Sequence, residues 1–565
     1  MPFRKTATDR QRYKGEFFTP LPFAEKALEY IEAQLGKNYL QTGQYRLWDM
    51  AAGTGHLELR LPSEVLPYCY LSTLYQDDVL TLQKHFPNAA QIFRYDYLND
   101  DTESVFQKNI FQENISLTNN GGKQTMPEQL LNDLRDPAIK WIIPLNPPYA
   151  TAQNAAMKGQ SKSGVADTQI RQRMHGEGLG EVSRELYTQF LYRIKTEFKD
   201  RDTVLGLFAP LKYLLSCNYQ KFRDKIFQCR FLSGFVFSSA AFHGTSPANH
   251  FPVSFILWNL RQTQTLNSQN IVLDVYNESL ENTGSKYLRL AKRPQFLNQW
   301  IKRPPATIVF PPFSSAITVK EGNSDTRNRI AEGFLASLMC PGNELQNQQK
   351  TAFLSGPQVS AGALSVTAEN FEQAMTVFAA RKIPKNTWLN HVDQLLKPNQ
   401  ELPEKFVTDC AVWSLFDNKN QTAALKNVAY QGKVYQVHNH FFPFSVTKIQ
   451  QWNIGIPVIR SEIESAENTY TADWLAGRNL SSEATAVFDA AENICRYYFR
   501  HLPEIPYKKY KIATWDAGWR QITLALSESS IYCYKKEFAV LRHFRDVLKS
   551  MILPQLAFFG IISPE

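Results

Sequence analysis

The stretch LWDMAAGTGHLELRL, Leu47–Leu61, contains the pattern that decides the fold. An apolar run ends at Asp49, Gly53 and Gly55 then allow a tight turn that a Cβ would obstruct, and a helical pattern starts near His56. This G-x-G turn fits many nucleotide sites. Because neither G-x-G-x-x-G nor G-x-x-x-x-G-K-[ST] is present, the sequence argues against dinucleotide and P-loop sites.

Around this stretch, roughly the first 260 residues alternate strand patterns with helical patterns. Strands are predicted at residues 45–51, 69–75, 90–95, 141–145, 203–210, 231–238 and 251–260, and helices at residues 24–35 and 183–198. This alternation predicts an α/β fold with a doubly wound, mostly parallel sheet that is covered on both faces. Ligands of such sheets bind beyond the carboxyl ends of the strands.

A second polar site follows the predicted strand at residues 90–95. In FRYDYLND, Asp96 can accept a hydrogen bond from an exocyclic purine amine, and the ring of Tyr97 can pack on the face of the base. The alternative is an ordinary turn aspartate, which is common at strand ends.

A third site follows the strand at residues 141–145, in WIIPLNPPYA. Pro147 and Pro148 stop the strand because neither has an N–H for a ladder. The rigid corner can present the Asn146 carboxamide and the Pro147 carbonyl as two acceptors beside the flat ring of Tyr149. This arrangement describes a socket for an –NH2 group on a planar substrate, and a plain Pro-Pro turn is the alternative.

Four motifs in this order resemble motifs X, I, III and IV of the γ-group amino-methyltransferases that use S-adenosylmethionine. They are FFTP (Phe17–Pro20), DMAAGTG (Asp49–Gly55), YDYL (Tyr95–Leu98) and NPPY (Asn146–Tyr149). The resemblance covers about residues 15 to 260 and implies a class I methyltransferase fold, which is Rossmann-like. Within that family, NPPY most often marks the N6-adenine DNA methyltransferases of restriction–modification systems.

The resemblance also implies a role for each matching residue. One group of residues would bind the cofactor. Phe18 and Thr19 would contact its methionine end, and Asp96 with Tyr97 its adenine. The amino-acid moiety would be held by Asp49, Ala51, Gly53 and Gly55. Where the family has an acid for the ribose, this sequence departs from the pattern, and Asp77 is taken in preference to Asp78. A second group would act on the target base: Asn146, Pro147, Pro148 and Tyr149 as catalytic residues, with Tyr149 and Phe251 stacking on opposite faces of a flipped base. Core packing is the alternative for Phe251, and no metal ligand is expected.

Beyond the catalytic domain, expected at residues 1–265, the strict alternation fades. A target-recognition domain is expected at residues 266–480 and a helical region at residues 481–565. Cations interleave with aromatic residues in SKYLRLAKRPQFLNQWIKRPP, and further cations occur in AARKIPKNTW and YKKYK. Together with a net charge of +9, this pattern suits phosphate contacts and base stacking on double-stranded DNA, although any single patch is also compatible with a solvated helical face.

The sequence therefore predicts a site-specific DNA adenine-N6 methyltransferase in a restriction–modification or phage-defence context, with cytosine N4 left open. Alternatives are methylation of RNA or of protein glutamine, and a cofactor-binding, DNA-binding subunit without activity. A separate restriction or defence subunit is a candidate partner. Only about fifteen residues precede the first motif, so no N-terminal nuclease is expected, and HNH at residues 438–440 is interpreted as coincidence. Seven scattered cysteines, no signal peptide and no long apolar run predict a cytoplasmic protein without a membrane span.

Overall fold

The chain forms two compact units. The computed structural model describes residues 17–100, 126–150, 168–242, 250–320, 327–359, 363–455, 457–505, 507–510, 512, 514–529 and 534–563. Unit 1 contains Met1–Lys292 and Thr387–Val392, and unit 2 contains Arg293–Asn386 and Asp393–Glu565.

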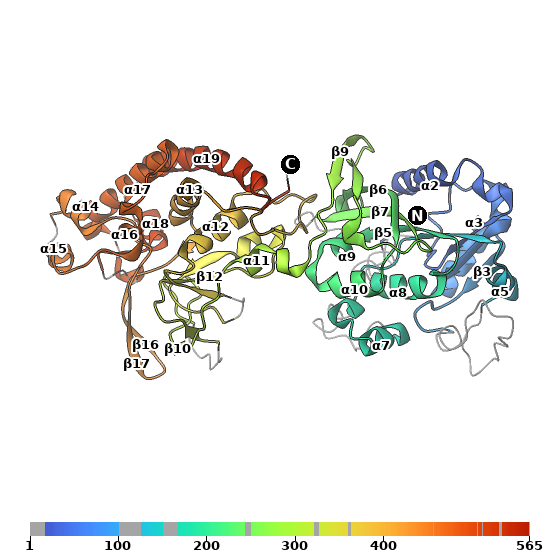
Figure 1. Cartoon of the computed structure of the whole chain (residues 1–565), viewed down its shortest axis with the longest axis horizontal. Helices are drawn as coiled ribbons and strands as arrows, with labels where there is room; N and C mark the ends of the chain where they lie inside the picture. Colours follow the sequence, from blue (N-terminus) through green and yellow to red (C-terminus); the bar gives the residue numbers. More distant parts are fainter. Residues whose placement is uncertain are drawn as a thin grey trace. The chain divides into compact units, whose positions relative to one another are not determined.

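Unit 1 is built on a nine-stranded sheet with the order β3-β2-β1-β4-β5-β7-β6-β8-β9 (Figure 1). Its strands are β1 (Tyr45–Asp49), β2 (Cys69–Thr73), β3 (Gln91–Arg94), β4 (Lys140–Leu145), β5 (Thr203–Pro210), β6 (Arg230–Ser238), β7 (Pro252–Asn259), β8 (Val272–Tyr276) and β9 (Asn282–Tyr287). The first five strands are parallel, and β7 lies antiparallel between β5 and β6. The strand order reverses between β1 and β4, as in doubly wound sheets. The expected α/β fold with a doubly wound, mostly parallel sheet is thus confirmed.

Alternate residues of the central strands enter two different cores, one on each face of the sheet. Trp48 and Trp141 belong to the first core, whereas their neighbours Leu47 and Ile142 belong to the second. The first core is covered by α8 (Leu186–Phe198) and the second by α2 (Leu21–Leu35). Other helices of unit 1 are α3 (Gln76–His85), α5 (Glu128–Arg135), α7 (Gln169–Gly176), α9 (Lys212–Leu215) and α10 (Gln220–Lys225). Burial on both faces explains why these strands appear in the sequence as continuous apolar runs.

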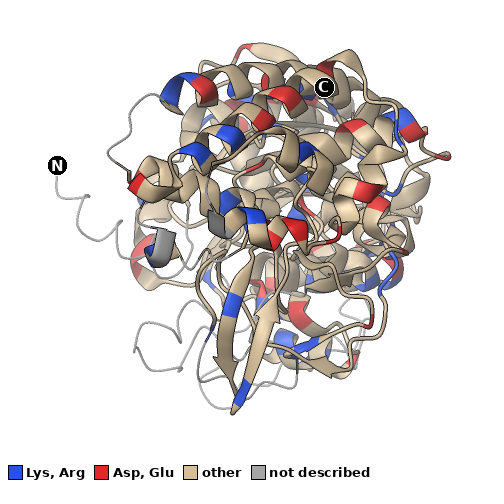
Figure 2. Ribbon diagram, turned by 90° about the vertical axis from the view of Figure 1, so that its left-hand side faces the viewer, with Lys and Arg blue, Asp and Glu red and all other residues tan. Residues whose placement is uncertain are grey.

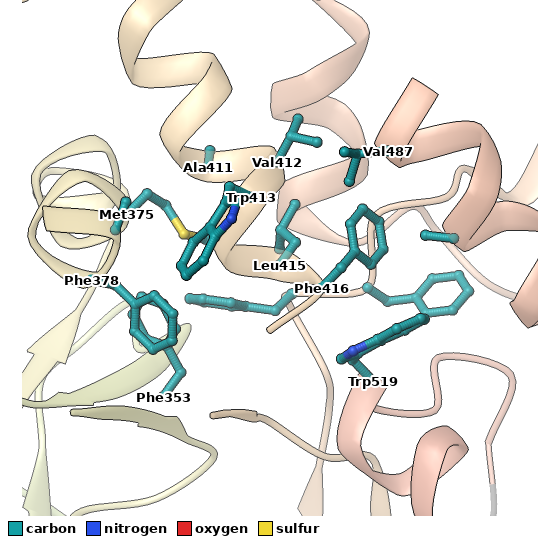
Figure 3. Close-up of a cluster of buried hydrophobic side chains, with 14 of the residues drawn as sticks. Phe353, Met375, Phe378, Ala411, Val412, Trp413, Leu415, Phe416, Val487 and Trp519 are labelled. Carbon is teal, nitrogen blue, oxygen red and sulfur yellow. The ribbon is translucent and has the colours of Figure 1, made fainter. Parts of the chain in front are cut away.

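Unit 2 combines a small sheet, of order β14-β12-β13-β15, with a group of helices. Its strands are β10 (Ile308–Val309), β11 (Arg329–Ile330), β12 (Ala336–Met339), β13 (Ala352–Leu354), β14 (Leu364–Val366), β15 (Asn420–Gln421), β16 (Leu425–Tyr430) and β17 (Lys433–Val437). Its helices are α11 (Leu297–Trp300), α12 (Phe371–Lys382), α13 (Glu404–Leu415), α14 (Val446–Gln451), α15 (Pro457–Glu464), α16 (Tyr470–Ala476), α17 (Ser482–Arg500), α18 (Trp519–Ser527) and α19 (Tyr534–Phe558). Figure 3 shows the core where α12, α13, α17 and α18 meet, with Phe378, Trp413, Phe416 and Trp519 among its members.

The two units divide the chain at different positions from the regions expected from sequence. The sheet of unit 1 continues through β8 and β9, so this unit extends past residue 265. In unit 2, one core joins residues of both the 266–480 and the 481–565 regions; for example, Phe378 and Val487 belong to the same cluster. The recognition role assigned to residues 266–480 stays a prediction.

Two local expectations have different outcomes in the structure. The prediction of a helix that begins near His56 is wrong. Residues 50–60 instead form successive turns, in which Gly55 N donates to Ala52 O and Glu58 N donates to Gly55 O. The helical region expected at residues 481–565 contains α17, α18 and α19. None of the helices in the described part of the chain is long and apolar enough to cross a membrane.

Candidate active site

A cavity of about 190 Å³ lies where the carboxyl ends of β1 to β4 meet. Its lining comes from segments that are far apart in the sequence: residues 17–19, 49–53, 56–57, 73–75, 78, 95–99, 146, 148, 168, 186 and 190. All four motifs contribute to it. The topology therefore brings the predicted site residues together at the edge where doubly wound sheets bind ligands.

Asp49 ends β1 and is 1% exposed, with Oδ1 accepting a hydrogen bond of 2.8 Å from Ala51 N. Glu58 is equally buried beside it. The carboxyl groups of the two residues hydrogen-bond to each other, and no other described side chain bonds to Glu58. Burial raises the pKa of Asp49 to about 7, and burial together with the charge of Asp49 raises the pKa of Glu58. The site thus holds two buried acids that a cationic group would stabilise.

The two glycines of the turn have different roles. Both have positive φ angles, +53° at Gly53 and +84° at Gly55. Gly53 lines the cavity, and a Cβ there would meet no atom closer than 3.8 Å. Gly55 is not in the lining; a Cβ there would lie 2.4 Å from Phe86 and 2.8 Å from Leu82. Gly55 therefore packs the turn against α3, whereas Gly53 leaves space for a ligand.

The predicted ribose acid lies outside the cavity. Asp77 is exposed in the first turn of α3, whereas Asp78, the next residue, is 7% exposed and lines the cavity. Successive helical positions point about 100° apart, so only one of the two can face the site. The geometry favours Asp78 over Asp77.

The Asp96 side chain lines the cavity and is fixed by its own loop. Its Oδ1 accepts from Leu98 N at 3.1 Å and its Oδ2 from Asn99 Nδ2 at 2.8 Å. Tyr97 also lines the cavity, but its ring stacks on Phe190 with centroids 5.5 Å apart. Asp96 is therefore held by turn bonds and remains at the cavity wall.

A buried ion pair on α8 supports the loop that carries Asp96. Arg193 Nε lies 2.5 Å from Glu197 Oε1, and the side chains of both residues are 0% exposed. The guanidinium also donates to the Tyr97 and Asp100 carbonyls, and Tyr97 OH donates to Glu197 Oε2 at 2.7 Å. This support could not be found from the motifs, because it comes from a helix about 100 residues later in the chain.

Asn146 follows β4 and has its amide fixed by the first motif. Nδ2 donates to the Phe17 carbonyl and to Thr19 Oγ1, both at 2.8 Å. Oδ1 accepts a hydrogen bond of 2.8 Å from Tyr149 OH. Since both amide hydrogens are engaged, the carboxamide has one orientation, and its oxygen keeps one lone pair beyond the bond from Tyr149.

The aromatic residues expected around the target base are placed differently from the expectation. Tyr149 is outside the cavity lining and packs edge-on against Tyr187 and Phe242, with centroids 6.3 and 6.4 Å away. Phe251 is also outside the lining and packs on the second core, while its backbone N–H donates to Ser239 Oγ. Burial raises the pKa of Tyr149, so its hydroxyl stays protonated and can donate to Asn146.

The remaining predicted residues divide between lining and support. Phe18, Thr19, Ala51 and Pro148 line the cavity, and Pro147, which is buried, does not. His56 was not predicted, but it lines the cavity, its ring centroid lies 5.1 Å from that of Phe18, and its Nδ1 lies 3.1 Å from the Thr19 carbonyl. It was missed because a turn was expected to end before it.

The basic patches of unit 2 are only partly at the surface. Arg381, in AARKIPKNTW, is 1% exposed and donates to Thr351 Oγ1, Asn298 Oδ1 and two backbone carbonyls. This cation is structural. Of YKKYK, Lys511 lies outside the described residues. Residues 151–167 also lie outside them; they belong to the polar stretch between Ala150 and Ser183, whose sequence is compatible with a lid or with disorder.

Comparison with known proteins adds a likeness at the level of fold. No family model and no curated protein matches the chain. The chain is similar in structure to restriction–modification proteins.

Three of these structures illustrate the similarity. The type IIL restriction-modification enzyme MmeI in complex with DNA matches over 94% of this chain and 77% of its own, at 10% identity and a TM-score of 0.36. A modification subunit of a putative type I restriction enzyme from Vibrio vulnificus YJ016 matches over 51% of this chain and 57% of its own, at 13% identity and a TM-score of 0.30. DrdV in its DNA complex matches over 61% of this chain and 36% of its own, at 14% identity and a TM-score of 0.35. This chain therefore spans about a third of DrdV and somewhat over half of the Vibrio subunit.

Proposed function

We propose that this protein is a site-specific DNA methyltransferase that transfers a methyl group from S-adenosylmethionine to the N6 atom of a flipped adenine. The observation that carries the proposal is the fixed carboxamide of Asn146 in a cavity that also contains Asp49, Gly53 and Asp96. We infer a restriction–modification or phage-defence setting, in which a separate restriction subunit is a candidate partner.

The residues of the cavity fit the proposed cofactor chemically. Asp49 lines the cavity, and Glu58 lies beside it outside the lining. Neither buried acid forms an ion pair with a described cation, which suits an amino-acid ammonium and a sulfonium. In our proposal, Asp78 holds the ribose hydroxyls, Asp96 accepts from the adenine amine, and Gly53 allows close approach of the backbone. When bound, S-adenosylmethionine supplies an electrophilic methyl group.

The chain's own residues would prepare the target amine. The N6 lone pair of adenine is delocalised into the ring and is a poor nucleophile. Hydrogen bonds from its two N–H groups to Asn146 Oδ1 and to the Pro147 carbonyl would favour a more tetrahedral nitrogen. Because the nitrogen loses a proton only after it has gained the methyl group, these acceptors need to orient the amine rather than deprotonate it. Catalysis would come from positioning and fixed dipoles.

The Tyr149 hydroxyl has a further role in this proposal. Its bond to Asn146 Oδ1 holds the acceptor in place from the side of the core. Removing the target base from the duplex costs a few kcal/mol, and a rigid acceptor lowers the additional cost of ordering the site. Stacking on the base by Tyr149 would need a movement of its ring out of its contacts with Tyr187 and Phe242.

The experiment that tests the proposal measures labelled-methyl transfer to duplex DNA, to RNA and to protein by the purified chain. We expect transfer to duplex DNA, with N6-methyladenine as the product, and a loss of at least ~100-fold in Asn146→Ala because the positioned acceptor is removed. Binding of S-adenosylhomocysteine should remain within a few-fold of the parent. Asn218→Ala, at an exposed asparagine of the same unit, is the matched control.

Each contrary outcome has a distinct meaning. Full transfer by Asn146→Ala would contradict the role of the carboxamide. Transfer to RNA or to protein glutamine, without transfer to DNA, would show that DNA is not the substrate. Cofactor binding without any transfer by the parent chain would indicate a non-catalytic subunit.

A further inference from the structure

Unit 2 projects a two-stranded hairpin made of β16 and β17 (Figure 1). Tyr430 pairs with Lys433 across the turn Gln431–Gly432, whose φ angles are +49° and +73°. Two consecutive left-handed residues form the turn that matches the twist of a hairpin. At its base, Leu425 and Val437 are buried in a small core, which fixes the hairpin to the unit.

The two faces of the hairpin differ. One face is supported: Tyr435 packs edge-on against Phe310 at 5.5 Å, and Tyr430 OH accepts from Asn328 Nδ2 at 2.7 Å. The other face carries Ala429 and Val434, a cross-strand pair. Both are exposed, and Val434 is 66% exposed, which is unusual for a valine.

Beside this exposed apolar pair lies a pair of amides. Gln436 Nε2 donates to Asn427 Oδ1 at 3.2 Å, and both side chains are exposed. One amide oxygen and the remaining N–H groups of the pair stay available for a ligand. Asn and Gln side chains read the edge of adenine, and apolar side chains contact the methyl group of thymine.

The hairpin itself carries charge of one sign. No Asp or Glu occurs between Asp417 and Glu462, whereas this stretch contains Lys419, Lys426, Lys433, Lys448 and Arg460. Figure 2 shows lysines and no acidic residue on the hairpin. Lys426 pairs with Glu462 near the base, while Lys433 is exposed beside the turn. This charge is complementary to a polyanion.

We propose that the hairpin of β16 and β17 enters a groove of double-stranded DNA and reads base edges with Asn427, Gln436 and Val434, while Lys433 contacts a phosphate. The inference rests on the proposed DNA substrate. A two-stranded ribbon fits the major groove, and a six-residue strand is roughly 20 Å long, against a groove depth of about 8.5 Å. The supported face, with Tyr430 and Tyr435, keeps the ribbon rigid so that its outer face can be presented to the bases.

The decisive variant is Val434→Asp in the full-length chain. The side chain is exposed, so the fold should be retained, but an acid on this face would approach the phosphates and the acceptor-rich base edges. We expect binding to duplex DNA of mixed sequence to weaken by at least ~10-fold. Val540→Asp is the matched control, because this valine is 39% exposed on α19, which lies on the opposite side of unit 2 (Figure 1). It should bind within about twofold of the parent.

Two further variants separate phosphate contact from base reading. Lys433→Ala should weaken binding at all sequences and reduce the slope of log affinity against log salt by about 1. The double variant Asn427→Ala/Gln436→Ala should leave the slope of log affinity against log salt unchanged. Modification-sensitive sequencing should show relaxed discrimination, by about 10- to 100-fold, at one or two positions of the recognised site.

The outcomes distinguish this inference from the proposed function. Equal DNA binding by the Val434→Asp and Val540→Asp variants would overturn the hairpin proposal, whether or not the chain methylates DNA. Hairpin-dependent DNA binding by a chain without transfer activity would support it and overturn the proposed catalysis. Tighter, hairpin-dependent binding to single-stranded RNA than to duplex DNA would overturn it in favour of an RNA partner.

Discussion

Glu58 lies in surroundings that normally disfavour a carboxylate. It is 1% exposed, and its one side-chain partner among the described residues is another acid, Asp49. Two adjacent buried acids cannot both ionise without a large electrostatic cost, so in the absence of a cation the pair retains at least part of a proton near neutral pH. A cationic ligand would remove this cost, which links occupancy of the site to proton release.

This pair predicts a specific dependence of stability on pH. The pKa of Asp49 is raised from 3.8 to about 7 in the folded state. The stabilisation that comes from the bound proton is therefore complete below pH about 4 and is lost as the pH rises through about 7. Glu58→Leu should raise the free energy of unfolding at pH 8 by about 1–3 kcal/mol and change it little at pH 5.

Urea unfolding at pH 5, 6, 7 and 8 checks this prediction, with Glu64→Gln as a control at an exposed acid. Parallel stability curves for the parent and Glu58→Leu would contradict it. In the parent, affinity for S-adenosylhomocysteine should increase from pH 6 to pH 8, because its ammonium group prefers the ionised form of Asp49.

The glycine turn after β1 shows how an element divides its residues between packing and binding. Gly55→Ala should lower the free energy of unfolding of unit 1 by about 2–4 kcal/mol, from the contact with Phe86 and the left-handed backbone. Gly43→Ala, at a positive φ with no atom within 4 Å, should cost only about 1–2 kcal/mol.

Gly53→Val should have a different effect from Gly55→Ala. We expect a loss of stability from the left-handed backbone at Gly53, and in addition a large loss of cofactor affinity because the side chain would occupy the cavity. Thermal unfolding and calorimetric titration of the three variants separate the two effects. Unchanged titration of Gly53→Val would show that the turn does not contact the cofactor.

The elements that could be predicted are those whose signal is local. Every strand predicted in the first 260 residues forms, and β2, β4, β5 and β7 gave the clearest signal because strands buried on both faces are continuous apolar runs. The four motifs follow the strands they were expected to follow, and the topology brings them to one cavity. β8 and β9 were missed because they lack a continuous apolar run: Asp274 interrupts VLDVY, and NTGSKY is mostly polar and exposed.

The parts of the site that could not be predicted depend on helix phase and on distant contacts. Asp77 and Asp78 cannot be distinguished in the sequence, because only the orientation of α3 determines which of them faces the cavity. Tyr149 looks like a stacking ring in the sequence, but its hydroxyl bonds to Asn146 and its ring is packed. The support of the Asp96 loop by Arg193 depends on a helix about 100 residues away.

At the scale of the whole molecule, two units with separate cores should unfold separately. The cores of unit 1 surround one sheet, and the largest core of unit 2 joins α12, α13, α17, α18 and α19. We expect two calorimetric transitions. S-adenosylhomocysteine at 100 times its Kd should stabilise unit 1 by about 2.7 kcal/mol and leave the transition of unit 2 unchanged. A single transition that shifts as a whole would contradict this independence.

The segment Thr387–Val392 belongs to unit 1, although the chain on both sides of it belongs to unit 2. Trp388, Leu389 and Val392 pack on the first core of unit 1. A unit 2 exchanged between related proteins by joining two genes at residue 293 would therefore bring a foreign patch to unit 1. Exchange of unit 2 is constrained by these few residues: a chimera must keep them from the parent that supplies unit 1.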